Sequence, residues 1–183
     1  MSGFRHLGDN TIHQGRVLHL VQGRFASPDH EEFQRDVVRA PGAVAVVAVD
    51  DRGQGPEVVL VRQYRPAVDD WLVEIPAGLR DKEGEAPEAT AVRELAEEVG
   101  LAADAYELLT EFVNAAGMTN QRTVIYLATG LRPVPSQADG LEEQYLSVER
   151  RPLADAVEAA ANGELIDAKT VIGLLLAERR LRR

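Results

Sequence analysis

The sequence contains no cysteine and no long hydrophobic segment. The absence of cysteine among 183 residues excludes both a disulfide framework and a thiolate metal site. No run of about 20 apolar residues is present to span a bilayer, and no apolar stretch typical of a signal peptide follows Met1. We therefore expect a soluble cytoplasmic protein that does not bind membranes.

Basic residues are scarce relative to acidic ones. The chain has 20 Lys and Arg against 30 Asp and Glu, a formal net charge of −10. This balance argues against a general nucleic-acid-binding protein. An acidic protein that handles an anionic substrate needs cations to bridge the two, which points to a metal ion.

The most informative segment is residues 93–101, Arg-Glu-Leu-Ala-Glu-Glu-Val-Gly-Leu. Successive helical residues turn by about 100°, so one face gathers four apolar side chains that we expect to pack on a core: Val92, Leu95, Ala96 and Val99. The opposite side gathers three carboxylates: Glu94, Glu97 and Glu98. Their mutual repulsion costs a few tenths of a kcal/mol per pair, and a divalent cation such as Mg²⁺ would offset it. The alternative is a solvated acidic helix face.

The flanking residues favour the metal site over the solvated face. Residues 71–75 have the composition of a strand and lead into a Pro-Gly turn at residues 75–78. A charged loop follows at residues 79–84, then Glu85, then the acidic helix, which ends at Gly100. This order of strand, tight turn, loop and acidic helix is typical of a phosphate-and-metal site.

This arrangement resembles the motif of the Nudix hydrolase family. That motif runs Gly, five residues, Glu, seven residues, then Arg-Glu-apolar-any-Glu-Glu-any-Gly-apolar. From Glu85 onward the sequence matches at every position. Six residues rather than five separate Gly78 from Glu85, and we interpret the extra residue as a bulge in residues 81–84 that leaves the helix intact.

The resemblance implies roles for individual residues. Glu94 and Glu98 would hold Mg²⁺, or Mn²⁺ in its place, with Glu97 binding directly or through water and the main-chain carbonyl of Ala77 as a further ligand. Four residues would be structural parts of the motif: Gly78, Glu85, Arg93 and Gly100. Glu85 and Arg93 would form an ion pair, although a helix N-terminal acid and a surface arginine are the simpler alternatives.

The general base is less well defined by the sequence. Some Nudix enzymes use a motif glutamate, and others use a carboxylate on a later loop. Residues 137–144 form an acidic segment in which Glu142 or Glu143 would accept a proton from the attacking water. A plain solvated loop is the alternative for this segment.

Three further segments, residues 61–65, 74–78 and 163–170, resemble the ADP-ribose pyrophosphatase branch of the family. The implied activity is hydrolysis of the pyrophosphate bond of ADP-ribose to AMP and ribose 5-phosphate. Arg62 and Arg65 are candidate contacts to phosphate or ribose because guanidinium groups suit anions; their alternative is a charge on an edge strand.

The resemblance also implies a domain organisation. Residues 1–40 would form a small N-terminal β region that is dimer-forming or swapped to a partner subunit. Residues 41–183 would form the Nudix hydrolase domain, an α/β/α sandwich with a mixed β-sheet. We therefore expect a homodimer that binds a small-molecule nucleotide-sugar across its two subunits.

One departure bears on the substrate. Many enzymes of this branch carry a Ser-Pro-Gly-like segment near the substrate, whereas residues 114–120 keep Gly117 and have Ala116 in place of the proline. Hydrolysis of another nucleoside diphosphate sugar, such as a GDP-sugar, is therefore an alternative. A non-catalytic ADP-ribose-sensing module is a second, but such modules usually lose a motif glutamate and all are present here. A structural dimer-forming protein would leave the acidic helix unexplained.

Hydrophobic periodicity predicts the elements. Strands are expected at residues 16–22, 32–39, 43–49, 57–63, 71–75, 106–113 and 122–131. Helices are expected at residues 86–99 and 152–161, with a last helix capped by Asp167.

Overall fold

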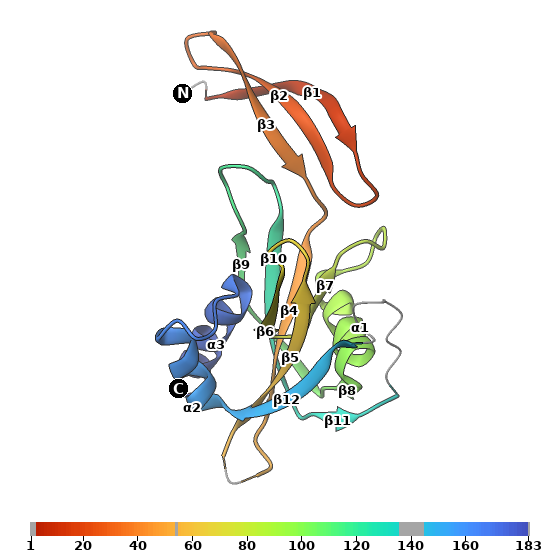
Figure 1. Cartoon of the computed structure of the whole chain (residues 1–183), viewed down its shortest axis with the longest axis vertical. Coiled ribbons are helices and arrows are strands. Elements are labelled where there is room, and N and C mark those ends of the chain that lie inside the picture. The colour runs from red at the N-terminus through yellow and green to blue at the C-terminus, as the bar shows by residue number, and fades with distance from the viewer. Residues whose placement is uncertain (1–2, 54, 136–144, 183) are drawn as a thin grey trace. The chain divides into compact units, whose positions relative to one another are not determined.

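The structure is a computed structural model that describes residues 3–53, 55–135 and 145–182 (Figure 1). The chain forms two compact units. The smaller comprises Met1–Gly42 with Phe112–Arg122, and the larger comprises Ala43–Glu111 with Thr123–Arg183.

The smaller unit is a three-stranded antiparallel sheet in the order β1-β2-β3. Its strands are β1 (Arg5–Gln14), β2 (His19–Ala26) and β3 (Glu32–Arg39). Phe25 and Phe33 face each other across β2 and β3 and stack with ring centroids 5.5 Å apart. The backbone N–H of Val38 donates to the carbonyl of Met118 at 2.8 Å, so the segment 112–122 joins this sheet.

The sequence-based prediction was incomplete here. The strand expected at residues 16–22 instead occupies His19–Ala26, and β1 was not expected at all. Two register shifts interrupt β1, between His6 and Gly8 and between Thr11 and His13. Such bulges break the alternation of side chains by which a strand is identified in a sequence.

The larger unit is built on a mixed seven-stranded sheet. Five strands lie in the order β12-β5-β4-β10-β9, while β6 pairs with β5 and β7 pairs with β4. Their bounds are β4 (Ala43–Asp50), β5 (Glu57–Arg65), β6 (Asp70–Glu74), β7 (Ala77–Leu79), β9 (Ala105–Val113), β10 (Arg122–Thr129) and β12 (Ser147–Pro152). β4 pairs parallel with β10 and antiparallel with β5. A separate two-stranded ladder joins β8 (Leu101–Ala102) to β11 (Arg132–Pro133).

In the part of the chain that the structure describes, three helices cover the two faces of this sheet: α1 (Pro87–Val99), α2 (Leu153–Ala161) and α3 (Ala168–Leu181) (Figure 1). Alternate residues of β4 point to opposite faces. Val44 and Val46 pack with Leu95 of α1, whereas Val47 lies beside Gly173 of α3. The expected α/β/α sandwich with a mixed sheet is therefore confirmed.

The sequence signals for the ends of helices are also confirmed. Pro87 opens α1, and Gly100 ends it in the left-handed conformation at φ 63°. The side chain of Asp167 caps α3 by accepting a hydrogen bond from the backbone N–H of Thr170 at 2.9 Å. No helix among the described residues is long and apolar enough to cross a membrane.

The orientation of α1 differs from the predicted one. Val92, expected in the core, is 41 % exposed, whereas Glu94, expected on the opposite side, is only 8 % exposed. Ala91 and Leu95, both fully buried, form the inner face instead. The helix is rotated because the turn at Gly78 provides room for the Glu94 carboxylate.

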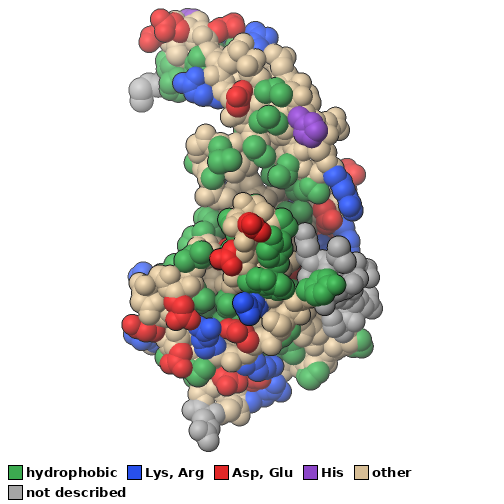
Figure 2. All heavy atoms as spheres, in the orientation of Figure 1, with side chains coloured by type: hydrophobic (Ala, Val, Ile, Leu, Met, Phe, Trp, Pro, Cys, Tyr) green, Lys and Arg blue, Asp and Glu red, His purple; other side chains and the backbone are tan. Residues whose placement is uncertain are grey.

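Acidic and basic side chains are interspersed over the face drawn in Figure 2. Local ion pairs fit this pattern, for example Asp50 Oδ2 with Arg52 Nη2 at 2.8 Å and with Arg150 Nη1 at 3.1 Å. Exposed pairs of this kind contribute little to stability because solvent and salt screen them. The fold therefore depends on the buried strands rather than on these surface charges.

The rotation of α1 gives a testable contrast between two apolar residues. Leu95→Ala should lower the free energy of unfolding by about 2–5 kcal/mol because it opens a cavity in the core. Val92→Ala should change it by less than about 1 kcal/mol because Val92 already faces solvent. Urea denaturation of both variants measures the difference, and equal losses would contradict the observed orientation.

Candidate active site

Strand β7 approaches α1 at Gly78; residues 77–79 form this strand, so the turn expected at residues 75–78 is limited to residues 75–76. A Cβ atom on Gly78 would lie 1.9 Å from Cδ of Glu94 and 2.2 Å from each of its carboxylate oxygens. Any side chain at this position would displace the carboxylate. Gly78 therefore allows Glu94 to be buried against the turn.

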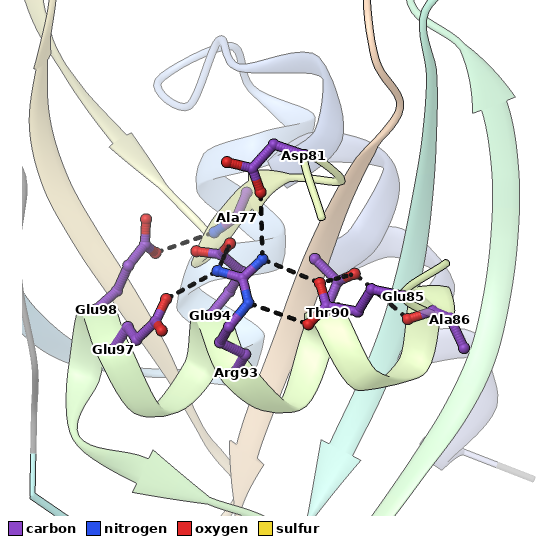
Figure 3. A network of polar contacts seen from close by, with 9 residues as sticks. All are labelled: Ala77, Asp81, Glu85, Ala86, Thr90, Arg93, Glu94, Glu97 and Glu98. Atoms are coloured by element: carbon purple, nitrogen blue, oxygen red, sulfur yellow. Dashed lines mark hydrogen bonds and ion pairs between the residues drawn. The ribbon is translucent and has the colours of Figure 1, made fainter. Parts of the chain in front are cut away.

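A second carboxylate of α1 is bound by the start of β7. The backbone N–H of Ala77 donates a hydrogen bond to Oε2 of Glu98 at 3.0 Å (Figure 3). Glu94 and Glu98 are four residues apart and thus lie on one side of the helix. The β7 residues Ala77 and Gly78 consequently fix two of the three predicted ligand carboxylates.

The Arg93 side chain lies among the carboxylates of Glu85, Glu94 and Glu97 (Figure 3). Its Nη1 donates to Glu94 Oε1 at 2.6 Å and to Glu97 Oε2 at 2.9 Å. Its Nη2 donates to Glu85 Oε2 at 3.1 Å, and Asp81 Oδ1 lies 3.7 Å away. With a side chain only 18 % exposed, Arg93 is not the solvated surface arginine considered as an alternative.

The electrostatics of this cluster follow from these contacts. The hydrogen bond from Arg93 holds the pKa of the Glu85 carboxyl below its ordinary value of 4.5, with help from the Thr90 hydroxyl. Hydrogen bonds to Glu85 and Glu97 and the nearby charge of Glu94 raise the pKa of Arg93. Arg93 is therefore a permanent cation that offsets part of the carboxylate repulsion.

The loop with the extra residue lies before this cluster. Gly84 has φ 77°, and the backbone N–H of Glu85 donates to the carbonyl of Lys82 at 3.1 Å. Residues 82–85 form this tight turn, which places the Glu85 side chain within hydrogen-bond distance of Arg93. The helical half of the motif is undistorted, as the bulge interpretation expected.

The structure gives the two candidate arginines of β5 different partners. Arg65 donates to both oxygens of Glu74, at 2.7 Å from Nε and 2.6 Å from Nη2. The Arg62 guanidinium lies over the Trp71 ring, 5.5 Å from its centroid. The ladder between β12 and β5 begins at Arg62, which pairs with Ser147, so the alternative of an edge-strand charge is wrong for Arg62; among the described residues this ladder does not extend to Arg65.

The remaining predicted residues do not belong to the described part of the larger unit, which carries this cluster. Gly117 is exposed and belongs to the smaller unit. Glu142 and Glu143 lie outside the described residues. Sequence reasoning missed two polar partners: Thr90, fully buried and bonded to Glu85, and Asp81. The position of Thr90 three residues before Arg93 would have placed it near that side chain on a helix.

A cavity of about 280 Å³ flanks the outer side of α1. Its lining comprises Val92, Arg93, Ala96, Glu97, Ala102, Arg132, Val134 and Pro135. Arg93 and Glu97 thus link the carboxylate cluster to an open space with both apolar and charged walls. The exposure of Val92 is explained by this cavity.

The carboxylates fit a divalent cation by chemistry. Mg²⁺ and Mn²⁺ prefer carboxylate and carbonyl oxygens, which Glu94, Glu97, Glu98 and the Ala77 main chain supply. Among the residues that the structure describes, no three acidic or imidazole groups are arranged as a complete metal site. Arg93 instead lies between Glu94 and Glu97 and provides the positive charge there.

The Glu85–Arg93 pair gives a pH-dependent prediction. A carboxylate whose pKa is lowered by folding stabilises the protein above about pH 4.5 and loses that contribution as the pH falls. Glu85→Gln should therefore lower Tm at pH 7, and its difference from the wild type should shrink between pH 5 and pH 3. Thermal unfolding across this range measures the difference; a constant gap would show that the charge of Glu85 does not contribute.

Comparison with known proteins places this site in a family. The NUDIX domain family matches residues 39–171, a range that includes the turn at Gly78 and all of α1. An ADP-ribose pyrophosphatase from Mycobacterium tuberculosis is 37 % identical over 94 % of this chain and 82 % of its own length. An ADP-ribose pyrophosphatase from Bacillus subtilis is 34 % identical over 89 % of this chain and 86 % of its own length.

A solved structure agrees on the fold. The structure described as "Crystal structure of ADP compounds hydrolase" superposes with a TM-score of 0.83 at 23 % identity, covering 100 % of this chain and 96 % of that one. Its fold therefore extends over both compact units. The family match, the relatives and the Gly78–Glu94–Arg93 arrangement agree, and this chain belongs to the Nudix hydrolase family.

Proposed function

We propose that this enzyme hydrolyses the pyrophosphate bond of ADP-ribose to AMP and ribose 5-phosphate, with Mg²⁺ as cofactor or Mn²⁺ in its place. The main support is the pair of ADP-ribose pyrophosphatases that match at 37 % and 34 % identity over most of both chains. The site adds support because every acidic position of the motif is present: Glu94, Glu97 and Glu98 lie on α1, and Glu85 lies just before it.

The proposed metal ligands are the three carboxylates of α1, Glu94, Glu97 and Glu98, with the main-chain carbonyl of Ala77. A divalent cation there would neutralise the diphosphate and lower the pKa of the attacking water. Gly78 and the Ala77 N–H hold Glu94 and Glu98 in place. Arg93 places a positive charge between Glu94 and Glu97 and so offsets part of their repulsion.

The proposed general base is Glu142 or Glu143, which would accept a proton from the attacking water. A motif glutamate is the alternative. Within the motif, the Glu97 side chain is 34 % exposed against 11 % for Glu94, so Glu97 has better access to water.

Substrate contacts are proposed for Arg62, Arg65 and Gly117. Arg65 donates two hydrogen bonds to the buried Glu74 carboxylate. As a substrate contact, its guanidinium would therefore already be held in place before substrate binds. Ala116 replaces a proline found in many relatives of this branch, and it should affect selectivity more than the chemical step.

The proposed assembly is a cytoplasmic homodimer in which residues 1–40 contribute to the contact between subunits and residues 41–183 carry the chemistry. The small size of the three-stranded sheet supports this role, because so few strands bury little apolar surface alone. Neither nucleic acid nor membrane is proposed as a partner.

A substrate panel tests the proposed activity. Phosphate release in the presence of added phosphatase would be measured for ADP-ribose, ADP-glucose, GDP-mannose, UDP-glucose and NADH, with Mg²⁺ or with chelator. We expect chelator-sensitive cleavage with ADP-ribose preferred. Preference for GDP-mannose would show that the enzyme is specific for another nucleotide-sugar. Binding of ADP-ribose without cleavage would indicate a sensor.

The metal ligands are tested by Glu98→Gln. The amide oxygen of glutamine still accepts the Ala77 N–H, so folding should persist, while loss of the charge should lower kcat by about 100-fold or more. Glu88→Gln on the exposed first turn of the same helix is the matched control and should retain nearly full activity. Wild-type activity in Glu98→Gln would refute its role as a ligand.

A further inference from the structure

Helix α3 contacts the strand end that leads into the site turn. The backbone N–H of Ile75 donates to Oγ1 of Thr170 at 2.9 Å, across 95 residues of sequence. The Thr170 hydroxyl donates its own proton to Oδ2 of Asp167 at 2.6 Å. Because a hydroxyl has a single proton, this donation leaves its oxygen to accept from Ile75. Thr170 is fully buried, so water does not compete for either bond.

A second contact lies one turn further along the same face of α3. A Cβ atom on Gly173 would be 3.0 Å from Cδ1 of Ile75 and 2.9 Å from Cγ2 of Val47. Gly173 therefore permits α3 to approach Ile75 and β4 more closely than any larger residue would. The Ile75 backbone and its side chain are thus both held by α3.

A third contact involves charge. The Nζ of Lys169 forms an ion pair with Glu74, which is 1 % exposed, and lies 3.0 Å from Asp167 Oδ1. Burial alone would raise the pKa of Glu74, but the hydrogen bonds from Arg65 and the charge of Lys169 outweigh it and lower that pKa. Glu74 thus remains an anion held from both β5 and α3.

These contacts end immediately before the residues that bind the carboxylates of α1. Only Pro76, whose ring restricts φ, separates Ile75 from Ala77. The Pro76 carbonyl accepts a hydrogen bond from the Val46 N–H at 2.9 Å. The main chain of residues 75–77 is therefore held by β4 through Pro76 and by α3 through Ile75.

We propose that Thr170 is a positioning residue of the active site: its hydroxyl holds Ile75 so that Ala77 and Gly78 keep Glu98 and Glu94 in cation-binding geometry. The inference rests on the proposed function, since it assumes that these two carboxylates bind the metal ion. Thr170 touches neither the metal nor the substrate. Its effect reaches the site through the backbone of residues 75–78.

The test uses the full chain with Thr170→Val and Thr170→Ser. Valine has the same shape but no hydroxyl, whereas serine keeps the hydroxyl and loses a methyl group. Mn²⁺ affinity is measured without substrate, from the electron paramagnetic resonance signal of free Mn²⁺. We expect Thr170→Val to weaken Mn²⁺ binding by about tenfold, as loss of supporting contacts around a metal site does, and Thr170→Ser to stay within about twofold. Unchanged affinity in Thr170→Val would overturn the proposal.

A control separates positioning from general loss of stability. Val49→Ala removes buried apolar volume at the far end of β4, where Val49 pairs with Val58. It should lower Tm but leave Mn²⁺ affinity within about twofold. An equal loss of affinity in Val49→Ala would overturn the proposal.

If Thr170→Val does not fold, Thr170→Cys replaces it, because a thiol accepts hydrogen bonds only weakly. Wild-type Mn²⁺ affinity in Thr170→Cys would likewise overturn the positioning role of Thr170.

Activity distinguishes this inference from the proposed function. If the wild type binds Mn²⁺ but cleaves no nucleotide-sugar, the proposed function fails, and the affinity shift in Thr170→Val still supports positioning. If the wild type binds no Mn²⁺, the metal role of Glu94 and Glu98 fails and the positioning role fails with it.

Discussion

Repulsion among the carboxylates of α1 is the constraint on which the site depends. Glu94, Glu97 and Glu98 occupy less than two turns of one helix, and Glu85 approaches from the preceding loop. The guanidinium of Arg93 contacts three of these four acids. The positive charge of Arg93 offsets part of the repulsion among these acids. Arg93 thus helps the acids to remain close to one another.

Main-chain groups of residues 77 and 78 also help to hold the carboxylates of α1. The N–H of Ala77 binds Glu98, and the missing side chain of Gly78 makes room for Glu94. These contacts come from the main chain of residues 75–78. The position of that main chain is set by its neighbours, because β7 pairs with β4 and Ile75 is bonded to α3. The geometry of the acids therefore depends on packing across the sheet as well as on the helix that carries them.

Local patterns predicted the helices and the sandwich, because Pro87, Gly100 and Asp167 act on adjacent backbone. The rotation of α1 was not predictable in this way: the burial of Glu94 depends on Gly78, sixteen residues earlier in the sequence and in contact only after folding. The hydrogen bond between Ile75 and Thr170 spans 95 residues and leaves no periodic signal. β1 escaped detection because its bulges disrupt the alternation of side chains.

The distance along the chain between Ile75 and Thr170 also has a consequence for synthesis. During translation, the acids of α1 and the turn at Gly78 emerge well before α3. A nascent chain ending before residue 168 would contain all these acids while the Ile75 N–H lacked its Thr170 acceptor. Contacts between distant segments are also slow to form. The segment that forms α1 is therefore synthesised before the segment that forms α3. The hydrogen bond between Ile75 and Thr170 can form only after residue 170 has left the ribosome.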